Sequence, residues 1–214
     1  MLRTRMSPSP SAQTQAQQQD PDWIVRLGGR LFAWRTSLSL PIALALLTIP
    51  SRVPPWTLVW PGVVLIAAGE LVRLWAVRQI GVISRTRSDR LGPLVSTGPF
   101  GIVRNPLYTG NIALWTGFCF SADLPWLVPP VVLFFGFVYH AIVRWEEELL
   151  ESQLGEAYRA YAARVPRWIP SGNSSPSQTE SGGRFSWRDT VFSERGTLIA
   201  IAAGYVLLWV KRAL

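Results

Sequence analysis

Five apolar segments constrain the fold of this 214-residue chain more than any other feature. They cover about residues 38–49, 56–77, 106–120, 125–143 and 198–210. A helix needs about 20 apolar residues to cross a bilayer, so the second segment is long enough to span, whereas the first and last are short. Only 16% of the residues are charged, below the roughly 25% of a soluble domain. The sequence therefore predicts an all-α, polytopic membrane helix bundle of about five transmembrane segments.

Tryptophans mark the ends of these segments. The chain contains eleven, and several lie where an apolar run begins or ends, namely Trp34, Trp56, Trp75, Trp126, Trp145 and Trp209. Indole rings prefer the headgroup level of a bilayer, so this distribution is typical of an aromatic belt. It supports the assignment to the integral membrane class.

Composition divides the chain into four parts. Residues 1–30 are rich in Ser, Pro and Gln and lack the apolar core of a secretory signal, which predicts a disordered cytoplasmic tail. Residues 31–170 form the main membrane domain, and 171–190 form a flexible linker rich in Ser and Gly. Residues 191–214 form a C-terminal membrane helix.

Arginines indicate the orientation of the bundle. They cluster in the N-terminal region, in the loop 78–104 and in the region 144–195, while the remaining short connections carry only Arg52. Positively charged loops stay in the cytoplasm, so the N-terminus and the segments 78–106 and 144–170 are expected there, at the inner membrane in a bacterium.

The net charge of +8 does not indicate nucleic-acid binding, because the arginines flank apolar runs and no nucleic-acid-binding module is visible. The expected partner of this charge is the lipid bilayer. With one cysteine, Cys119, and one histidine, His140, the chain also lacks the ligands of a conventional metal centre.

An apolar stripe follows Arg144. Its residues recur at three- and four-residue steps: Leu150, Leu154, Tyr158, Tyr161 and Val165. The spacing predicts an amphipathic helix that leaves the membrane and lies along its cytoplasmic surface. Pro166 and Pro170 are expected to end it.

The first polar segment of interest is GPFGIVRNPLYTG, residues 98–110. Asn105 suits a helix N-cap and Pro106 the first helical turn, so the motif is explained by a helix start alone. The same helix N-terminus would offer amides and positive potential to a carboxylate or phosphate. Tyr108 is either an interfacial anchor or a hydroxyl and stacking surface for a nucleoside.

The second polar segment contains Glu146, Glu147 and Glu148 directly after an apolar helix. These residues are either a solvated helix face or a binding site whose carboxylate points into the bundle. The triplet repels itself and has few basic partners one turn away, and charge near the membrane is costly, which favours binding. Such a carboxylate could hold an ammonium group or a pair of ribose hydroxyls. Glu70 and Arg73, three residues apart, are expected to form a structural ion pair.

These motifs occur in a recognisable order. Gly-x-Phe-x-x-x-Arg-Asn-Pro-x-Tyr-x-Gly is followed by an apolar hairpin, by Glu-Glu-x-x-Leu, and by Gly-x-x-Tyr-x-x-Tyr-x-x-x-Val-Pro-Arg. This order resembles the isoprenylcysteine carboxyl methyltransferase family, which includes phospholipid N-methyltransferases and small-thiol S-methyltransferases. The resemblance covers about residues 91–170 and implies a methyltransferase-like domain within 31–170.

The resemblance implies a multi-pass enzyme that binds S-adenosylmethionine on the cytoplasmic side and meets a lipophilic or small amphiphilic acceptor through the bilayer. By motif match, the residues that would bind the cofactor are Gly92, Pro93, Leu94, Val95, Phe100, Asn105, Pro106, Leu107, Tyr108, Glu146 and Glu147. No metal is implied.

Two residues depart from the carboxyl methyltransferase pattern. Asn105 replaces a histidine, and Ile142 stands where that subgroup has an arginine that contacts substrate. Arg144 and His140 lie nearby without matching in register, and we take them as candidate catalytic residues. A thiol or amine acceptor must lose a proton, for which His140 or a glutamate could serve, whereas a carboxylate needs no base.

The sequence therefore predicts S-adenosylmethionine-dependent methyl transfer to a carboxylate, amine or thiol. Two alternatives stay open. One is an NADPH-dependent membrane reductase of similar helical architecture. The other is a non-catalytic membrane scaffold or sensor that retains the fold.

Overall fold

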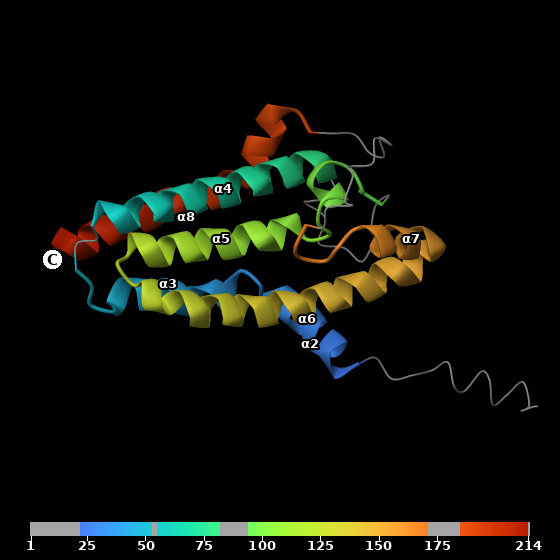
Figure 1. Ribbon diagram of the computed structural model, residues 1–214, viewed down its shortest axis with the longest axis horizontal. Coiled ribbons are helices and arrows are strands. Elements are labelled where there is room, and N and C mark those ends of the chain that lie inside the picture. The colour runs from blue at the N-terminus through green and yellow to red at the C-terminus, as the bar shows by residue number, and fades with distance from the viewer. Residues whose placement is uncertain (1–21, 53–54, 82–93, 171–184, 214) are drawn as a thin grey trace, which may run out of the picture.

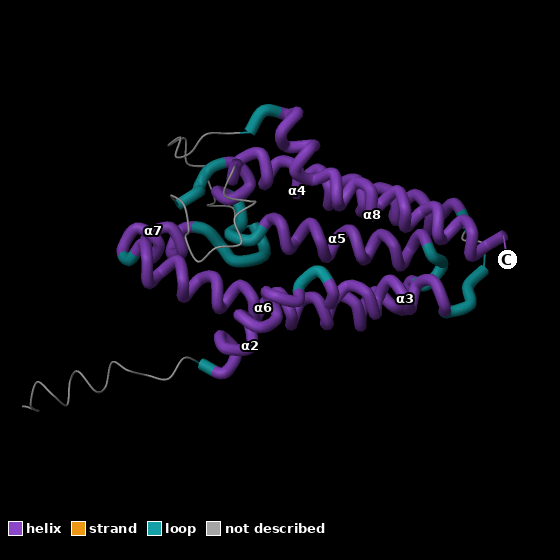
Figure 2. The backbone as a smooth tube through the Cα atoms, turned by 180° about the vertical axis from the view of Figure 1, so that it is seen from behind, coloured by secondary structure: helices purple, strands orange, loops and turns teal. Residues whose placement is uncertain are grey.

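The computed structural model describes residues 22–52, 55–81, 94–170 and 185–213. Most of the expected tail, most of the expected linker, and Gly92 and Pro93 lie outside these ranges. The described residues form helices and loops without strands (Figures 1 and 2). The α-helices are α2 (Trp23–Trp34), α3 (Leu40–Thr48), α4 (Trp56–Ile80), α5 (Pro106–Ser121), α6 (Val128–Leu154), α7 (Glu156–Arg164) and α8 (Trp187–Ala213). Short 3-10 turns are η1 (Ser37–Ser39), η3 (Gly98–Gly101) and η4 (Pro125–Leu127).

The bundle is built around α5, which lies between α4 and α6 in Figure 1. The last helix, α8, runs along α4, and α2 packs across α6. Apolar residues of α6 fill the interior: Phe135 and Ile142 are fully buried and pack with Cys119 of α5 and Leu208 of α8. Cys119 thus behaves as a small apolar side chain.

Helices α4 and α5 approach each other closely through facing glycines. A Cβ atom added to Gly69 would lie 2.7 Å from the Gly110 carbonyl oxygen, and one added to Gly117 would lie 2.6 Å from that of Gly62. Small residues let membrane helices approach closely and gain backbone contacts where the bilayer supplies no hydrophobic drive for association. This contact fixes the rotation of α4 relative to α5.

The predicted all-α membrane bundle is confirmed, with fewer helices of spanning length than the five segments expected. Within the described ranges, three stretches are long and apolar enough to cross a membrane: Trp56–Ile80, Pro125–Leu154 and Trp187–Ala213. A fourth is possible if Trp23–Trp34 and Ser37–Thr48, bent by 86°, count as one broken span. At 16 residues, α5 is shorter than these.

Helix boundaries also differ from the sequence-based expectation. The last helix begins at Trp187, eleven residues before the apolar run, because its first turns are polar but still helical. The expected surface helix is split: α6 runs unbroken to Leu154, Gly155 has a φ of 52°, and α7 begins at Glu156. A positive φ is easily adopted by glycine, so the chain turns here and folds back (Figure 1).

We expect Gly69→Ala to lower the melting temperature of the detergent-solubilised protein. The added methyl group would collide with backbone, and overpacking of this kind costs about 1–3 kcal/mol. The matched control is Gly136→Ala in α6, where an added Cβ would meet nothing within 4 Å. The control should melt at or above the wild-type temperature because alanine favours helix. Equal melting of both variants would contradict the tight α4–α5 contact.

Candidate functional site

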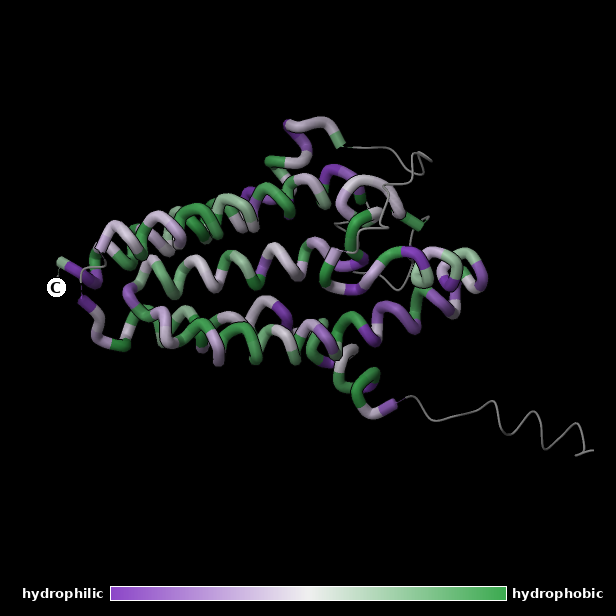
Figure 3. Tube along the Cα trace, in the orientation of Figure 1, coloured by the Kyte–Doolittle hydropathy of each residue, from purple (hydrophilic) through white to green (hydrophobic). Residues whose placement is uncertain are grey.

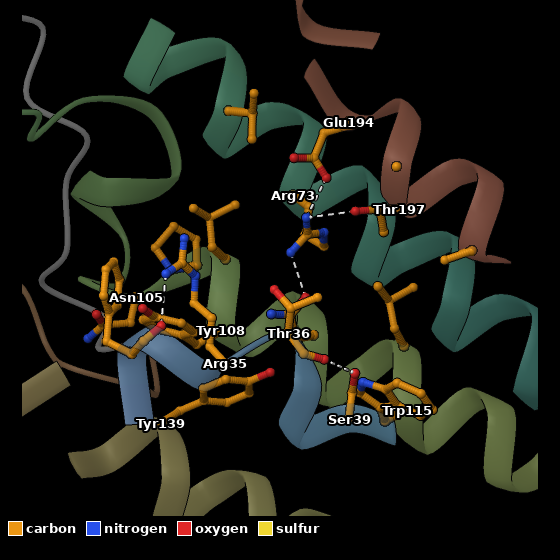
Figure 4. A pocket seen from close by; sticks show the side chains of 18 of the residues that line it. Arg35, Thr36, Ser39, Arg73, Asn105, Tyr108, Trp115, Tyr139, Glu194 and Thr197 are labelled. Atoms are coloured by element: carbon orange, nitrogen blue, oxygen red, sulfur yellow. Dashed lines mark hydrogen bonds and ion pairs between the residues drawn. The ribbon is translucent and has the colours of Figure 1, made fainter. Parts of the chain in front are cut away.

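A cavity of about 1420 Å³ opens between the helices and is lined by residues of α2 to α8 (Figure 4). Ligand pockets commonly measure roughly 300–1,000 Å³. The cavity therefore has room for more than one small molecule. Its lining changes from polar at the start of α5 to apolar deeper in the bundle.

The two polar segments singled out in the sequence meet in this cavity. The Tyr108 hydroxyl of α5 donates a hydrogen bond to Glu146 Oε1 of α6 at 2.9 Å. Tyr108 also stacks on Tyr139 of α6, with ring centroids 4.6 Å apart. None of the ion pairs among the described residues includes Glu146. Its carboxylate thus keeps acceptor capacity for a ligand.

Glu147 is held differently, by two arginines. Arg167 forms a bidentate pair with it, Nε to Oε1 at 2.9 Å and Nη2 to Oε2 at 2.6 Å. Arg104 Nη1 lies 3.0 Å from Oε1. The three residues come from η3–α5, from α6 and from the segment after α7. Paired Arg–carboxylate hydrogen bonds are strong and directional. Glu147 therefore ties these three parts of the chain together beside the cavity.

Asn105 occupies the N-cap position of α5 but makes no side-chain cap. Its amide donates instead to the Arg167 carbonyl oxygen at 3.1 Å, and the Arg104 backbone N–H donates to the Pro166 carbonyl at 2.9 Å. The expected side-chain cap is therefore absent, and the Asn105 side chain is held by the segment after α7 instead. These bonds close the cavity at the start of α5.

Two tyrosines of α7 complete this end of the cavity. The Tyr161 hydroxyl donates to the Phe100 carbonyl at 2.8 Å. Tyr158 and Tyr161 pack with Val165, Leu94 and Leu154. Burial raises the pKa of Tyr161 above its usual range, and burial and the Glu147 charge raise the pKa of Tyr158. Both phenols therefore stay protonated donors at neutral pH. The residues of the predicted apolar stripe do pack together, although they lie on α6, on α7 and, for Val165, directly after α7.

Nine of the predicted cofactor residues line this cavity: Leu94, Val95, Phe100, Asn105, Pro106, Leu107, Tyr108, Glu146 and Glu147. Gly92 and Pro93 lie outside the described residues. Whether the nine bind a cofactor stays a prediction, but the structure brings them to one place.

The two candidate catalytic residues do not share this position. Neither Arg144 nor His140 lines the cavity, and Arg144 lies 3.6 Å from Asp22 on the side of α6 that faces α2. Each helical residue is rotated by about 100°, so Arg144 lies about 200° around α6 from Glu146. Neither residue therefore shares the cavity with the predicted cofactor residues, and a catalytic role for them stays a prediction.

A second polar group, deeper in the cavity, was missed by sequence reasoning. Arg73 of α4 donates through Nη1 to Asn111 Oδ1 at 2.5 Å, and through Nη2 to Glu194 and to Thr197 Oγ1 of α8, the latter at 3.1 Å (Figure 4). The expected pair with Glu70 is present at 3.5 Å. Glu194 precedes the apolar run that was read as the last span. The sequence feature that could have indicated this group was an acidic residue one helical turn before an apolar run.

Beyond this group the lining is apolar. Side chains of α3, α5 and α8 form it, including Leu46, Leu47, Leu114, Phe118, Leu207 and Leu208. Figure 3 shows the corresponding change along α6, from apolar in its first half to polar beyond the buried Val143. The cavity thus joins a polar end near the membrane surface to an apolar interior.

Comparison with known proteins agrees with this arrangement. Residues 57–157 match the model of the phospholipid methyltransferase family, which confirms the expected family over these residues. The chain is similar to the nickel-cobalt-cadmium resistance protein NccN of Alcaligenes xylosoxydans xylosoxydans, 30% identical over 148 residues, covering 66% of this chain and 64% of that protein. It is also similar to the cobalt-zinc-cadmium resistance protein CzcN of Cupriavidus metallidurans, 28% identical over 142 residues, covering 66% of this chain and 63% of that protein.

The chain thus aligns with just under two thirds of the length of these curated relatives. No solved structure matches it significantly.

We expect Glu147→Gln to destabilise the fold by about 3 kcal/mol, because it leaves Arg104 and Arg167 without their anion in a largely buried setting. The matched control is Glu151→Gln, whose pair with Arg159 is about half exposed and should contribute less than about 1 kcal/mol. Thermal melting in detergent would measure both. If Glu151→Gln is as unstable as Glu147→Gln, the pairing of Glu147 with two arginines contributes no more to stability than an exposed ion pair.

Proposed function

With residues 57–157 placed in the phospholipid methyltransferase family, we propose that the protein is an S-adenosylmethionine-dependent methyltransferase. Its acceptor would be lipid-soluble or amphiphilic, and the reaction would occur at the cytoplasmic face of the membrane. The observation that carries the proposal is the contact between Tyr108 and Glu146, because it joins both motif segments in one cavity.

The residues at the polar end suit this cofactor. Glu146 forms no ion pair among the described residues, although the Arg35 charge acts on it, so it can accept from an ammonium group or from ribose hydroxyls. Tyr108 and Phe100 offer aromatic surface, and Leu94 and Leu107 offer apolar surface to a base. Glu147 is already neutralised by two arginines, so we assign it to holding the site rather than to the cofactor's charge.

The bound cofactor would supply a methyl group already activated by its sulfonium charge. The protein's part is then to align the acceptor, exclude water and accommodate charge. The apolar interior of the cavity suits the hydrocarbon part of an acceptor. Its volume of about 1420 Å³ leaves space for cofactor and acceptor together.

The cytoplasmic placement rests on charge. The polar end of the cavity lies where α4 ends, where α5 begins and beside α7 (Figure 1). The sequence there carries Arg78, Arg104, Arg164 and Arg167, while the connection between α3 and α4 carries only Arg52 and that between α5 and η4 carries no arginine. This is the distribution expected of the cytoplasmic side. The names of the two relatives suggest that the methylated product serves resistance to divalent transition metals, which growth of a metal-sensitive host expressing this chain would test.

We expect Glu146→Gln to weaken S-adenosylmethionine binding by about 10- to 100-fold, the loss of one hydrogen bond to a charged group. Isothermal titration calorimetry on the purified protein in detergent would measure it. The matched control is Glu148→Gln, because Glu148 is exposed and does not line the cavity. It should bind like the wild type.

Unchanged binding in Glu146→Gln would remove this residue from the site. Saturable binding of NADPH in place of S-adenosylmethionine would favour the reductase alternative. Binding of neither cofactor by the wild-type protein would favour a non-catalytic role.

A further inference from the structure

Among the residues that the structure describes, the polar end of the cavity offers no free proton acceptor for the reaction. His140 does not line the cavity, and Glu147 is bound by two arginines. Glu146 lies at the position proposed for the cofactor. A thiol or amine acceptor must nevertheless lose a proton when it is methylated. The second polar group of the cavity contains a carboxylate in a suitable place.

Glu194 of α8 lines the cavity and is 8% exposed. Its Oε2 accepts a hydrogen bond from Arg73, whereas its Oε1 makes no hydrogen bond with any described residue. In Figure 4 only one of its two carboxylate oxygens is joined to Arg73. Because Glu194 lines the cavity, this oxygen is the one left to accept from a ligand there. Arg73 thus fixes the carboxylate and leaves one oxygen available.

The depth of Glu194 in the cavity fits the expected position of the polar group of the methyl acceptor. Asn111, which binds Arg73, lies three residues after Tyr108 on α5, about 4.5 Å further along the helix axis. Tyr139 stacks on Tyr108 and lines the same cavity. Glu194 and Thr197 therefore lie next to the cofactor end and before the apolar interior begins.

The charges in this part of the cavity also favour an acceptor whose polar group carries a proton. Glu70 is 6% exposed, both its oxygens lack hydrogen-bond partners, and its nearest cation is the same Arg73. Two carboxylates thus share one arginine. An uncompensated buried charge is costly, and a protein retains one mainly where it has a function.

Resting on the proposed function, we infer that Glu194 is the general base for a protic acceptor, a thiol or an amine with an apolar chain. The acceptor's S–H or N–H proton passes to Glu194 Oε1. The acceptor's electron pair forms the new bond to the methyl carbon as the bond from that carbon to the cofactor's sulfur breaks, leaving its electrons on sulfur. The protonated carboxyl group later returns its proton to water at the polar end.

The test compares three probes of equal chain length, dodecanethiol, dodecylamine and dodecanoate, with labelled S-adenosylmethionine and the full-length protein in detergent. Glu194→Gln keeps the shape of the side chain and a hydrogen bond to Arg73. We expect it to slow transfer to the thiol and the amine by about 100-fold, the usual worth of a general base. Transfer to dodecanoate and cofactor binding should not change.

Glu70→Gln is the matched control, since it removes a carboxylate from the same cluster but from a residue that does not line the cavity. It should alter the rates by no more than a few fold. The rate of Glu194→Gln with the thiol should recover as pH rises, because the free thiolate then needs no base. The charged and titratable groups around Glu194 are Arg73, which pairs with it, Glu70 of the same helix, and Tyr139 of α6, which the Arg73 charge also reaches.

Wild-type rates in Glu194→Gln with thiol and amine would overturn the inference. Equal losses of transfer rate in both variants with all three probes, together with lower melting temperatures, would also overturn it. The cluster would then have only the structural role of holding α4 against α8. If the wild-type protein methylates only dodecanoate, Glu194 is not a general base, but the proposed function still holds. Absence of both cofactor binding and transfer in the wild type would remove both proposals.

Discussion

The pairing of Glu147 with Arg104 and Arg167 is the interaction on which the site depends. It joins the entry to α5, the polar half of α6 and the segment after α7. These parts are far apart in sequence, and each carries charge that would be costly to bury alone. Mutual neutralisation lets them close over one end of a membrane bundle. Without it, the start of α5 would face water, and the cavity would lose its polar end.

The cavity that results has an ordered polarity. Glu146 and Tyr108 lie nearest the closing segment, the Arg73–Glu194 group lies about one helical turn deeper, and apolar side chains of α3, α5 and α8 lie beyond. A reaction between a polar cofactor and an amphiphilic acceptor requires this order, because the two molecules enter from different solvents. The cofactor enters from water and the acceptor enters from lipid.

Part of this arrangement lies outside the residues matched by the family. The match covers residues 57–157, whereas α3 and α8 line the apolar interior and Glu194 belongs to α8. The closing segment after α7 also lies beyond it. The matched core thus carries the residues expected to hold the cofactor, while the flanking helices determine what can be placed against them. Specificity for the acceptor is accordingly expected to depend on the flanking helices.

The apolar runs determined the helical membrane class, because hydrophobic periodicity is a local property. The resemblance of the motif order to a known family implied nine residues that prove to line one cavity. The stripe from Leu150 to Val165 was also readable, although the turn at Gly155 was not. Three features came only from the tertiary structure: the partner of Glu147, the position of Arg144 and His140 off the site, and the meeting of Arg73 with Glu194, 121 residues apart. Each depends on how helices are rotated against one another. That rotation is decided by packing such as the Gly69–Gly110 contact, which no local pattern encodes.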